Sequence, residues 1–205
     1  MKGVAIITNK GGVGKTTLCH LLAVGAAGWR GVPTYFMHTD DRQPMAINGR
    51  PYAYLDARDP QKLSTLMESL MNDDGLCIID GGGNREGFDK WIAEAVDLVL
   101  IPAMADTESI DLALETMKKL ESDGVTHARY LLNMVSPNKN SRQFDFNHFY
   151  SKLEQDKIAG QIKRMEAVKR LGLPDDTEKF STPPSNVNNL SRTMYDIVKK
   201  TLSCL

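Results

Sequence analysis

The feature that most constrains the fold is a glycine-rich loop directly after a short apolar run near the start of the chain. The run spans Val4–Ile7, and the loop spans Thr8–Thr17 with the sequence TNKGGVGKTT. Glycines let backbone N–H groups turn toward an anion without a clash, and a helix beginning after the loop adds partial positive charge there. The strand–loop–helix order and the Gly-Lys-Thr ending predict a phosphate-binding loop; a glycine-rich turn that binds nothing is the weaker alternative.

Two side chains of the loop carry further chemistry. Lys15 can reach the β- and γ-phosphates of a nucleotide, and the Thr16 hydroxyl can ligate Mg²⁺. The loop residues predicted to contact the nucleotide are Lys10, Gly11, Gly12, Val13, Gly14, Lys15, Thr16 and Thr17.

Short apolar runs alternate with longer helical patterns over most of the chain. The runs have the continuous apolar character of strands buried on both faces, at Val4–Ile7, Thr34–Met37, Leu76–Ile79, Leu98–Ile101 and Tyr130–Val135. Helical patterns occupy Thr16–Trp29, Asp59–Asn72, Phe88–Val96 and Thr107–Ser122, the last of which is stopped by Gly124. The alternation predicts a doubly wound α/β fold, with a mostly parallel sheet covered by helices on both faces.

The pattern weakens in the last third of the chain. Ser136–Asn140 reads as a loop, and helices are expected over Phe144–Glu154 and within Gln161–Leu171. Prolines make Leu173–Ser185 an expected irregular loop, and a last helix is expected over about Asn188–Leu202.

Length and composition set further bounds. A chain of 205 residues suits one domain, so we expect residues 1–205 to form a single phosphate-loop domain. A net charge of −1 excludes a globally basic nucleic-acid binder but leaves a local basic patch open. Cys19, Cys77 and Cys204 lack the spacing of a disulfide framework, a zinc site or an iron–sulfur site. No apolar stretch is long enough to span a membrane, so a cytoplasmic protein is expected.

The loop departs from the common phosphate-loop pattern at its start. The first glycine of that pattern would fall at Asn9, and a second lysine, Lys10, opens the loop instead. Lys10–Thr17 closely resembles the deviant Walker A box of the ParA/MinD family of ATPases, which position plasmids, chromosomes, protein organelles or division sites. The resemblance covers roughly residues 1–135. It implies an ATP- and Mg²⁺-binding protein of bacteria or archaea in which Lys10 reaches across a homodimer to the partner's phosphates; a solvated loop lysine is the alternative.

A candidate catalytic carboxylate follows the second apolar run. The segment His38–Gln43 stands where the family usually has D-x-D-P-Q, so Asp40 matches the second aspartate and His38 replaces the first. A carboxylate here can orient attacking water or hold Mg²⁺ through water. Lys10, Lys15 and Asp40 are therefore the predicted catalytic residues. An Asp-rich turn is the alternative, and His38 leaves the rate of hydrolysis open.

Asp80 follows the third apolar run and precedes the glycines Gly81–Gly83. An aspartate at the end of an apolar strand is typical of a Walker B element near Mg²⁺, so Thr16, Asp40 and Asp80 are the predicted metal ligands. The glycines suit a segment that senses the γ-phosphate, and a strand-terminal turn is the alternative reading of Asp80.

The family resemblance also implies residues that contact the base. Asn133 ends a strand where the family has an asparagine that faces the adenine. Pro174 and Asp175 resemble the later loop that closes over the base. At Asn133, a simple turn residue is the alternative.

Basic residues gather toward the C-terminus. In partition ATPases, C-terminal basic residues bind the DNA backbone without sequence preference, whereas a charge run is more often a solvated helix face. The first-choice DNA-binding residues are Arg192, Lys199 and Lys200, with Lys163, Arg164, Lys169 and Arg170 as the second choice. An apolar stripe on the same last helix is expected to pack in the core rather than to enter a membrane.

Together these features predict an ATP-dependent dimerising switch that hydrolyses ATP to ADP and phosphate, slowly and with stimulation by an adaptor protein. Its expected task is partition or positioning of plasmid DNA or another large cargo, on the nucleoid in the DNA-binding case. Two other classes stay open. One is a metabolic ligase or kinase with a phosphate loop, which Lys10 disfavours. The other is a regulatory adaptor with little hydrolysis, for conjugation or membrane-site positioning, which His38 keeps open.

Overall fold

The computed structural model describes residues 1–40, 49–70, 72–81, 87–171, 180 and 182–205. Within these residues the chain forms a seven-stranded sheet in the order β3-β2-β4-β1-β5-β6-β7, with every neighbouring pair parallel. The strands are β1 (Lys2–Ile6), β2 (Thr34–His38), β3 (Ala53–Asp56), β4 (Leu76–Asp80), β5 (Leu98–Ala103), β6 (Ala128–Val135) and β7 (Ile158–Lys163).

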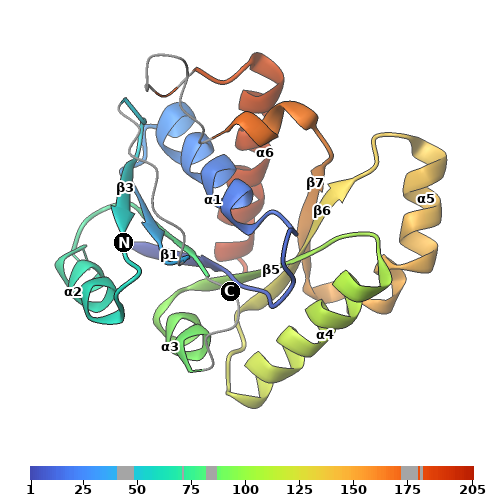
Figure 1. Ribbon diagram of the computed structural model, residues 1–205, viewed down its shortest axis with the longest axis horizontal. Helices are drawn as coiled ribbons and strands as arrows, with labels where there is room; N and C mark the ends of the chain where they lie inside the picture. The colour runs from blue at the N-terminus through green and yellow to red at the C-terminus, as the bar shows by residue number, and fades with distance from the viewer. Residues whose placement is uncertain (41–48, 71, 82–86, 172–179, 181) are drawn as a thin grey trace.

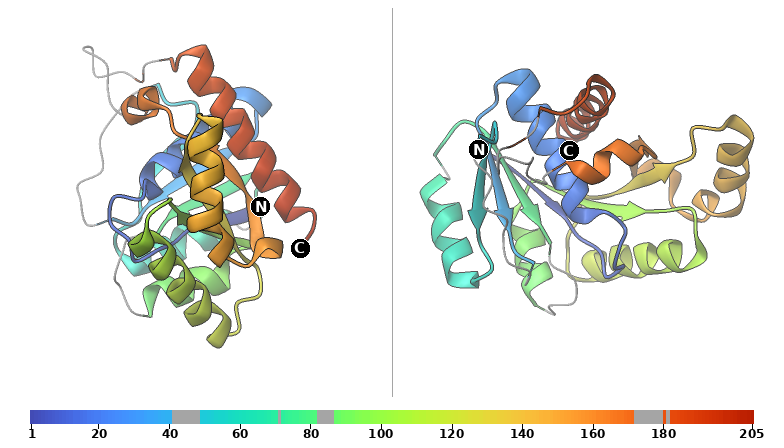
Figure 2. Two further views of the ribbon diagram at one scale, coloured as in Figure 1. Left: turned by 90° about the vertical axis from the view of Figure 1, so that its right-hand side faces the viewer. Right: turned by 45° about the horizontal axis from the view of Figure 1, so that its top comes forward.

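Helices cover both faces of this sheet (Figures 1 and 2). The α-helices are α1 (Lys15–Ala23), α2 (Pro60–Leu70), α3 (Phe88–Ala95), α4 (Thr107–Ser122), α5 (Lys139–His148) and α6 (Ser185–Leu202). Short 3₁₀ turns occupy Tyr150–Lys152, Gln155–Lys157 and Glu166–Arg170. Helices α1 and α6 lie on one face, and α2, α3 and α4 lie on the other (Figure 2). The predicted doubly wound α/β fold is confirmed.

The alternation of side chains along β1 explains why the strand is apolar at successive positions. Val4 and Ile6 enter the core beneath α1 and α6, whereas Ala5 and Ile7 enter the core beneath α2, α3 and α4. Successive strand residues point to opposite faces, so a strand covered on both sides needs an apolar residue at each position. All five apolar runs that predicted strands form strands of this sheet that helices cover on both faces.

Helix α4 has the bounds that its sequence predicts. Asp106 caps its first turn, with the Oδ1 atom accepting a hydrogen bond of 2.8 Å from the Ser109 backbone N–H. Gly124 ends it in the left-handed region at φ +87°, which a glycine adopts without steric cost. The helix therefore presents a fixed first turn toward the carboxyl edge of the sheet.

Two edge strands differ from the sequence expectation. Strand β3 was not predicted, and β7 (Ile158–Lys163) ends inside the segment Gln161–Leu171, where a helix was expected. Each pairs with a single neighbour, and β7 buries only Ile162 fully, so neither carries the continuous apolar run of a central strand. The helix predicted within Gln161–Leu171 was wrong; only a short 3₁₀ turn follows β7.

The boundaries of helices α5 and α6 also differ. Helix α5 begins at Lys139, inside the expected loop, because Asn138 Oδ1 accepts hydrogen bonds from the backbone N–H groups of Asn140 and Ser141. It ends at His148, before the predicted end at Glu154, and it buries no side chain that could create an apolar period. Helix α6 begins three residues early, at Ser185, and the expected loop before it lies mostly outside the described residues.

The helix predicted over Thr16–Trp29 changes type partway along. Its last six residues, Val24–Trp29, form a π-helix. At this point α6 comes into backbone contact, since a β-carbon at Gly25 would lie 2.1 Å from the Ser191 carbonyl oxygen. Among the helices that the structure describes, none has the length and apolar content needed to cross a membrane.

Candidate functional site

The candidate site lies where the strand order reverses. Strand β1 lies between β4 and β5, and the chain leaves its carboxyl end as the glycine-rich loop. Asp80 at the end of β4 is level with Ile6 of β1 and with His38 of β2. The reversal point of an open parallel sheet is where such folds bind ligands, and three chain segments meet there.

The loop has the conformation of an anion cradle. Gly12 and Gly14 adopt positive φ angles of +73° and +88°, and Gly14 precedes α1 without any side-chain cap on the helix. A β-carbon at Gly14 would lie 3.0 Å from the Asn133 amide nitrogen, whereas β-carbons at Gly11 and Gly12 would meet nothing within 4 Å. The first N–H groups of α1 therefore remain available to a phosphate, with space above the loop.

Lys15 places its ammonium group over the loop. Its Nζ atom donates hydrogen bonds of 3.1 Å each to the carbonyl oxygens of Thr8 and Lys10. A charged donor held against neutral carbonyls can exchange them for the stronger acceptor oxygens of a polyphosphate. The arrangement fits the predicted role of Lys15.

Thr16 and Asp80 meet at the base of the loop. The Thr16 hydroxyl donates a hydrogen bond of 2.6 Å to Oδ2 of Asp80, which is 1% exposed. Burial raises the pKa of the Asp80 carboxyl to about 6; the charge of Asp40 adds to the rise, and the Thr16 hydrogen bond opposes it. A divalent cation would stabilise the charged carboxylate here.

This pair of oxygen donors fits Mg²⁺ only with help from a ligand. No group of three His, Cys, Asp or Glu side chains that could hold a metal occurs in the part of the chain that the structure describes. Mg²⁺ characteristically takes one or two carboxylates together with waters and substrate phosphates. Thr16 and Asp80 would hold the ion against a nucleotide rather than bind it alone.

The end of β2 contacts the same carboxyl edge. The Thr39 hydroxyl donates a hydrogen bond to the Asp80 carbonyl oxygen, which joins the ends of β2 and β4. Asp40 follows, half-buried and close enough to affect the pKa of Asp80. His38 lies with Nδ1 3.1 Å from the Tyr54 hydroxyl on β3. The rest of the predicted box, residues 41–43, lies outside the described residues.

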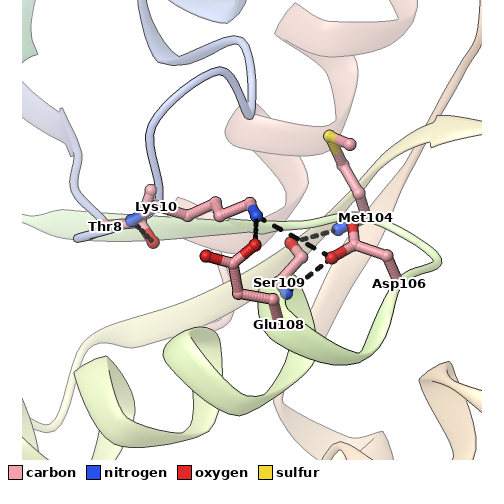
Figure 3. A network of polar contacts seen from close by, with 6 residues as sticks. All are labelled: Thr8, Lys10, Met104, Asp106, Glu108 and Ser109. Carbon is pink, nitrogen blue, oxygen red and sulfur yellow. Dashed lines mark hydrogen bonds and ion pairs between the residues drawn. The ribbon is translucent and has the colours of Figure 1, made fainter.

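Lys10 points away from the loop, toward the first turn of α4 (Figure 3). Its Nζ atom forms an ion pair with Glu108 and lies 4.0 Å from Oδ1 of Asp106. The Lys10 side chain is 17% exposed and that of Glu108 is 69% exposed. The lysine that the resemblance assigns to a partner subunit is thus paired within its own subunit in this structure.

Asn133 supports the loop from beneath. Its side-chain nitrogen donates a hydrogen bond of 2.7 Å to the Val13 carbonyl oxygen, and the residue is 5% exposed. A cavity of about 200 Å³ opens beside it, with walls that include Gly14, Thr17 and Met134. This cavity adjoins the phosphate loop, as a base pocket would. Pro174 and Asp175, the predicted base loop, lie outside the described residues.

Several residues at the site carry no sequence signal of their own. Thr39 contacts Asp80, Met134 lines the cavity, and Asp106 and Glu108 at the start of α4 contact Lys10. Lys163 and Arg164, second-choice DNA residues, are exposed and also line the cavity beside Asn133. Only a tertiary arrangement brings these residues to the loop, so spacing along the chain gives no indication of them.

The first-choice DNA residues divide into two environments. Lys199 and Lys200 are exposed in the last turn of α6. Arg192 is half-buried, with its guanidinium carbon 3.2 Å from the centre of the Trp29 ring, and it lines a cavity of about 310 Å³. Of the second-choice residues, the side chains of Lys169 and Arg170 lie outside the description.

Comparison with known proteins places the fold in a class. No protein-family model matches the chain, and no curated protein matches it either. The all-parallel sheet with its loop after β1 is the fold of the MinD and ParA phosphate-loop NTPases, so the predicted resemblance is confirmed at the level of fold.

Three solved structures illustrate the likeness. The MinD cell division protein of Aquifex aeolicus has 18% identity and a TM-score of 0.72, covering 99% of this chain and 98% of that chain. A putative plasmid partition protein of Borrelia burgdorferi bound to AMPPNP has 15% identity and a TM-score of 0.69, over 97% and 98% of the two chains. The septum site-determining protein MinD of Pyrococcus horikoshii, complexed with Mg-ADP, has 13% identity and a TM-score of 0.69, over 97% and 96%.

Proposed function

We propose that this chain is a ParA/MinD-type ATPase, a switch that dimerises with ATP, hydrolyses it to ADP and phosphate, and positions plasmid DNA or another large cargo. The observation that carries the proposal is the contact of Thr16 with Asp80, a carboxyl on which the charge of the Lys15 ammonium group also acts. A hydroxyl, a buried carboxylate and a lysine around an uncapped helix N-terminus are the parts that a Mg²⁺–nucleotide site requires. Residues 1–205 would work as one domain.

Each residue has a defined task in this proposal. The phosphates are bound by the backbone N–H groups of Gly11–Gly14 and by the Lys15 ammonium. Thr16 and Asp80 orient the part of the nucleotide that carries the cation. A Mg²⁺ ion held by Thr16 and Asp80 would neutralise charge on the phosphates. Asp40, at the end of β2, orients the attacking water. Asn133 keeps the loop in place through Val13 and borders the base.

The nucleotide and the partners follow from the same resemblance. The partition protein of Borrelia burgdorferi bound AMPPNP and the MinD of Pyrococcus horikoshii bound Mg-ADP, which supports ATP and Mg²⁺ as the cofactors here. A second copy of the chain is the first partner, and a stimulating adaptor protein is the second. Nonspecific DNA is the proposed surface, ahead of a membrane.

The distinguishing experiment measures phosphate release from ATP, with and without duplex DNA. A switch ATPase should turn over slowly and accelerate with DNA and its adaptor. Rapid turnover that depends on a small acceptor would indicate a metabolic ligase or kinase. ATP binding without turnover under any condition would indicate a regulatory adaptor, and either result would contradict the proposal.

Asp40→Ala should retain ATP binding and ATP-dependent dimerisation but lose turnover. Positioning of water or transfer of its proton contributes about a hundredfold or more to such a reaction, so phosphate release should fall by that order. Asp111→Ala, which removes an exposed acid from α4, is the matched control and should leave turnover unchanged. Unchanged turnover in Asp40→Ala would assign the water-positioning role to another residue.

Reversing the charges of Lys199 and Lys200 to glutamate should weaken DNA binding while leaving ATP-dependent dimerisation intact. The chain carries a net charge of −1, so DNA affinity must come from a local patch that dimerisation doubles. Binding should require ATP, ignore sequence, fall steeply with salt, and drop by about tenfold or more in the variant. Gel shift of duplex DNA at low salt measures it.

The control for this experiment reverses Lys62 and Lys118, two exposed lysines on α2 and α4, which alters net charge equally. DNA binding that falls equally in both variants would indicate a general charge effect. If the ATP-bound wild type shifts no DNA, the DNA surface is excluded, and sedimentation with liposomes tests the membrane alternative.

A further inference from the structure

We propose that Glu108 and Asp106 hold Lys10 within its own subunit and thereby set the ATP concentration at which the chain dimerises. The inference rests on the proposed function, because it needs Lys10 to reach the partner's phosphates in the dimer. We call the contact of Lys10 with these two acids the Lys10 latch. This contact opposes dimerisation of the chain.

The latch joins two segments far apart in the sequence. Lys10 Nζ pairs with Glu108, and Asp106 Oδ1 lies 4.0 Å away on the other side of the same turn of α4 (Figure 3). At its own end of the contact, the Lys10 backbone N–H donates a hydrogen bond of 3.3 Å to the Thr8 hydroxyl. The Lys10 ammonium therefore has two carboxylate neighbours in this arrangement.

Asp106 is held in place independently of Lys10. Asp106 accepts a hydrogen bond of 2.8 Å from the Ser109 N–H as the helix cap, and the Ser109 hydroxyl accepts one of 2.9 Å from the Met104 N–H. Both acids lie at the N-terminus of α4, where the helix dipole favours negative charge. Asp106 is therefore a fixed acid, and the exposed Glu108 side chain pairs with Lys10 beside it.

The latch opposes the dimer because Lys10 cannot contact both sets of anions at once. Crossing to the partner exchanges Glu108 and Asp106 for a nucleotide phosphate, which carries more charge and more acceptor oxygens. A symmetric dimer breaks one latch in each subunit, so the effect on the dimer dissociation constant is squared. An exposed ion pair contributes about threefold to an equilibrium, so two latches contribute about tenfold.

The first test is Glu108→Gln, measured by sedimentation equilibrium with a slowly hydrolysed ATP analogue. Removing the charge should tighten the dimer by about tenfold. Glu115→Gln is the control, since Glu115 is exposed on the same helix, and it should behave like wild type. Asp106→Asn keeps the helix cap, because asparagine caps as well as aspartate, and should tighten the dimer less. An unchanged or weakened dimer in Glu108→Gln overturns the latch.

The second test detects the contact itself. A carbodiimide should form an amide between Lys10 and Glu108 in the nucleotide-free wild type, identified by peptide mass spectrometry, and the ATP analogue should suppress it. A wild type that dimerises with ATP, gives no such amide and is unaffected by Glu108→Gln overturns the latch alone. A wild type that gives the amide but never dimerises overturns the proposed function.

Discussion

Lys15→Ala should abolish ATP binding. In the structure the Lys15 ammonium lies over the loop, 3.1 Å from the carbonyl oxygens of Thr8 and Lys10, so a bound polyphosphate would lose its main counter-charge. Hydrogen bonds to charged groups contribute about 1.5–3 kcal/mol each, so the loss of one or two lowers affinity by about a hundredfold or more. Calorimetric titration with ATP and Mg²⁺ measures the change.

The control for this variant is Lys118→Ala, an exposed lysine on α4 outside the site. Its ATP affinity should equal that of wild type. Lys15→Ala should unfold at nearly the wild-type temperature without nucleotide, because Lys15 is only partly buried. If a folded Lys15→Ala chain binds ATP normally, the phosphate-loop assignment itself is wrong.

Lys10→Ala should bind ATP but fail to dimerise. The Lys10 ammonium points to Glu108 on α4 rather than over its own loop, so removing it takes no contact from the phosphates of its own subunit. In the dimer, the proposed contact with the partner's phosphates is lost from both subunits. Sedimentation velocity with a slowly hydrolysed ATP analogue should show a monomer, with nucleotide affinity in the monomer unchanged.

The two halves of one ion pair should thus respond in opposite directions. Glu108→Gln should strengthen the dimer and Lys10→Ala should remove it, although both changes break the same contact. A purely structural ion pair would give the same sign in both variants. A Lys10→Ala chain that still dimerises would make Lys10 an ordinary loop lysine.

The parts of the fold predicted from sequence are those whose signal is local. The central strands carry continuous apolar runs because helices cover both of their faces, and α4 carries a cap, a helical period and a terminal glycine. Edge strands β3 and β7 were missed because their formation depends on pairing with one neighbour rather than on their own apolar content. Gly160 in β7 also depends on tertiary contacts, because a β-carbon there would collide with Ile197 of α6.

The candidate site divides in the same way. The loop and Asp80 could be predicted because adjacent residues in the sequence form their motifs. The partners of Lys10 and Val13 could not, because Glu108 lies 98 positions from Lys10 and Asn133 lies 120 positions from Val13. The resemblance assigned Asn133 to the adenine; its hydrogen bond to the Val13 carbonyl oxygen is a further contact that the sequence did not predict. That contact follows from the positions of β6 and the loop, which only the folded chain defines.

The close approach of Gly25 to Ser191 has a mechanical consequence. The helix that begins at the phosphate loop contacts α6, which ends near Lys199 and Lys200, through backbone atoms at Gly25 and Ser191. No side chain lies between the two backbones there to absorb a movement. Packed interiors transmit displacement rather than cushioning it. A tilt of α1 would therefore carry α6 with it, and Lys199 and Lys200 in the last turn of α6 would change orientation. Gly25 is thus the contact through which a movement that starts at the phosphate loop would reach those lysines.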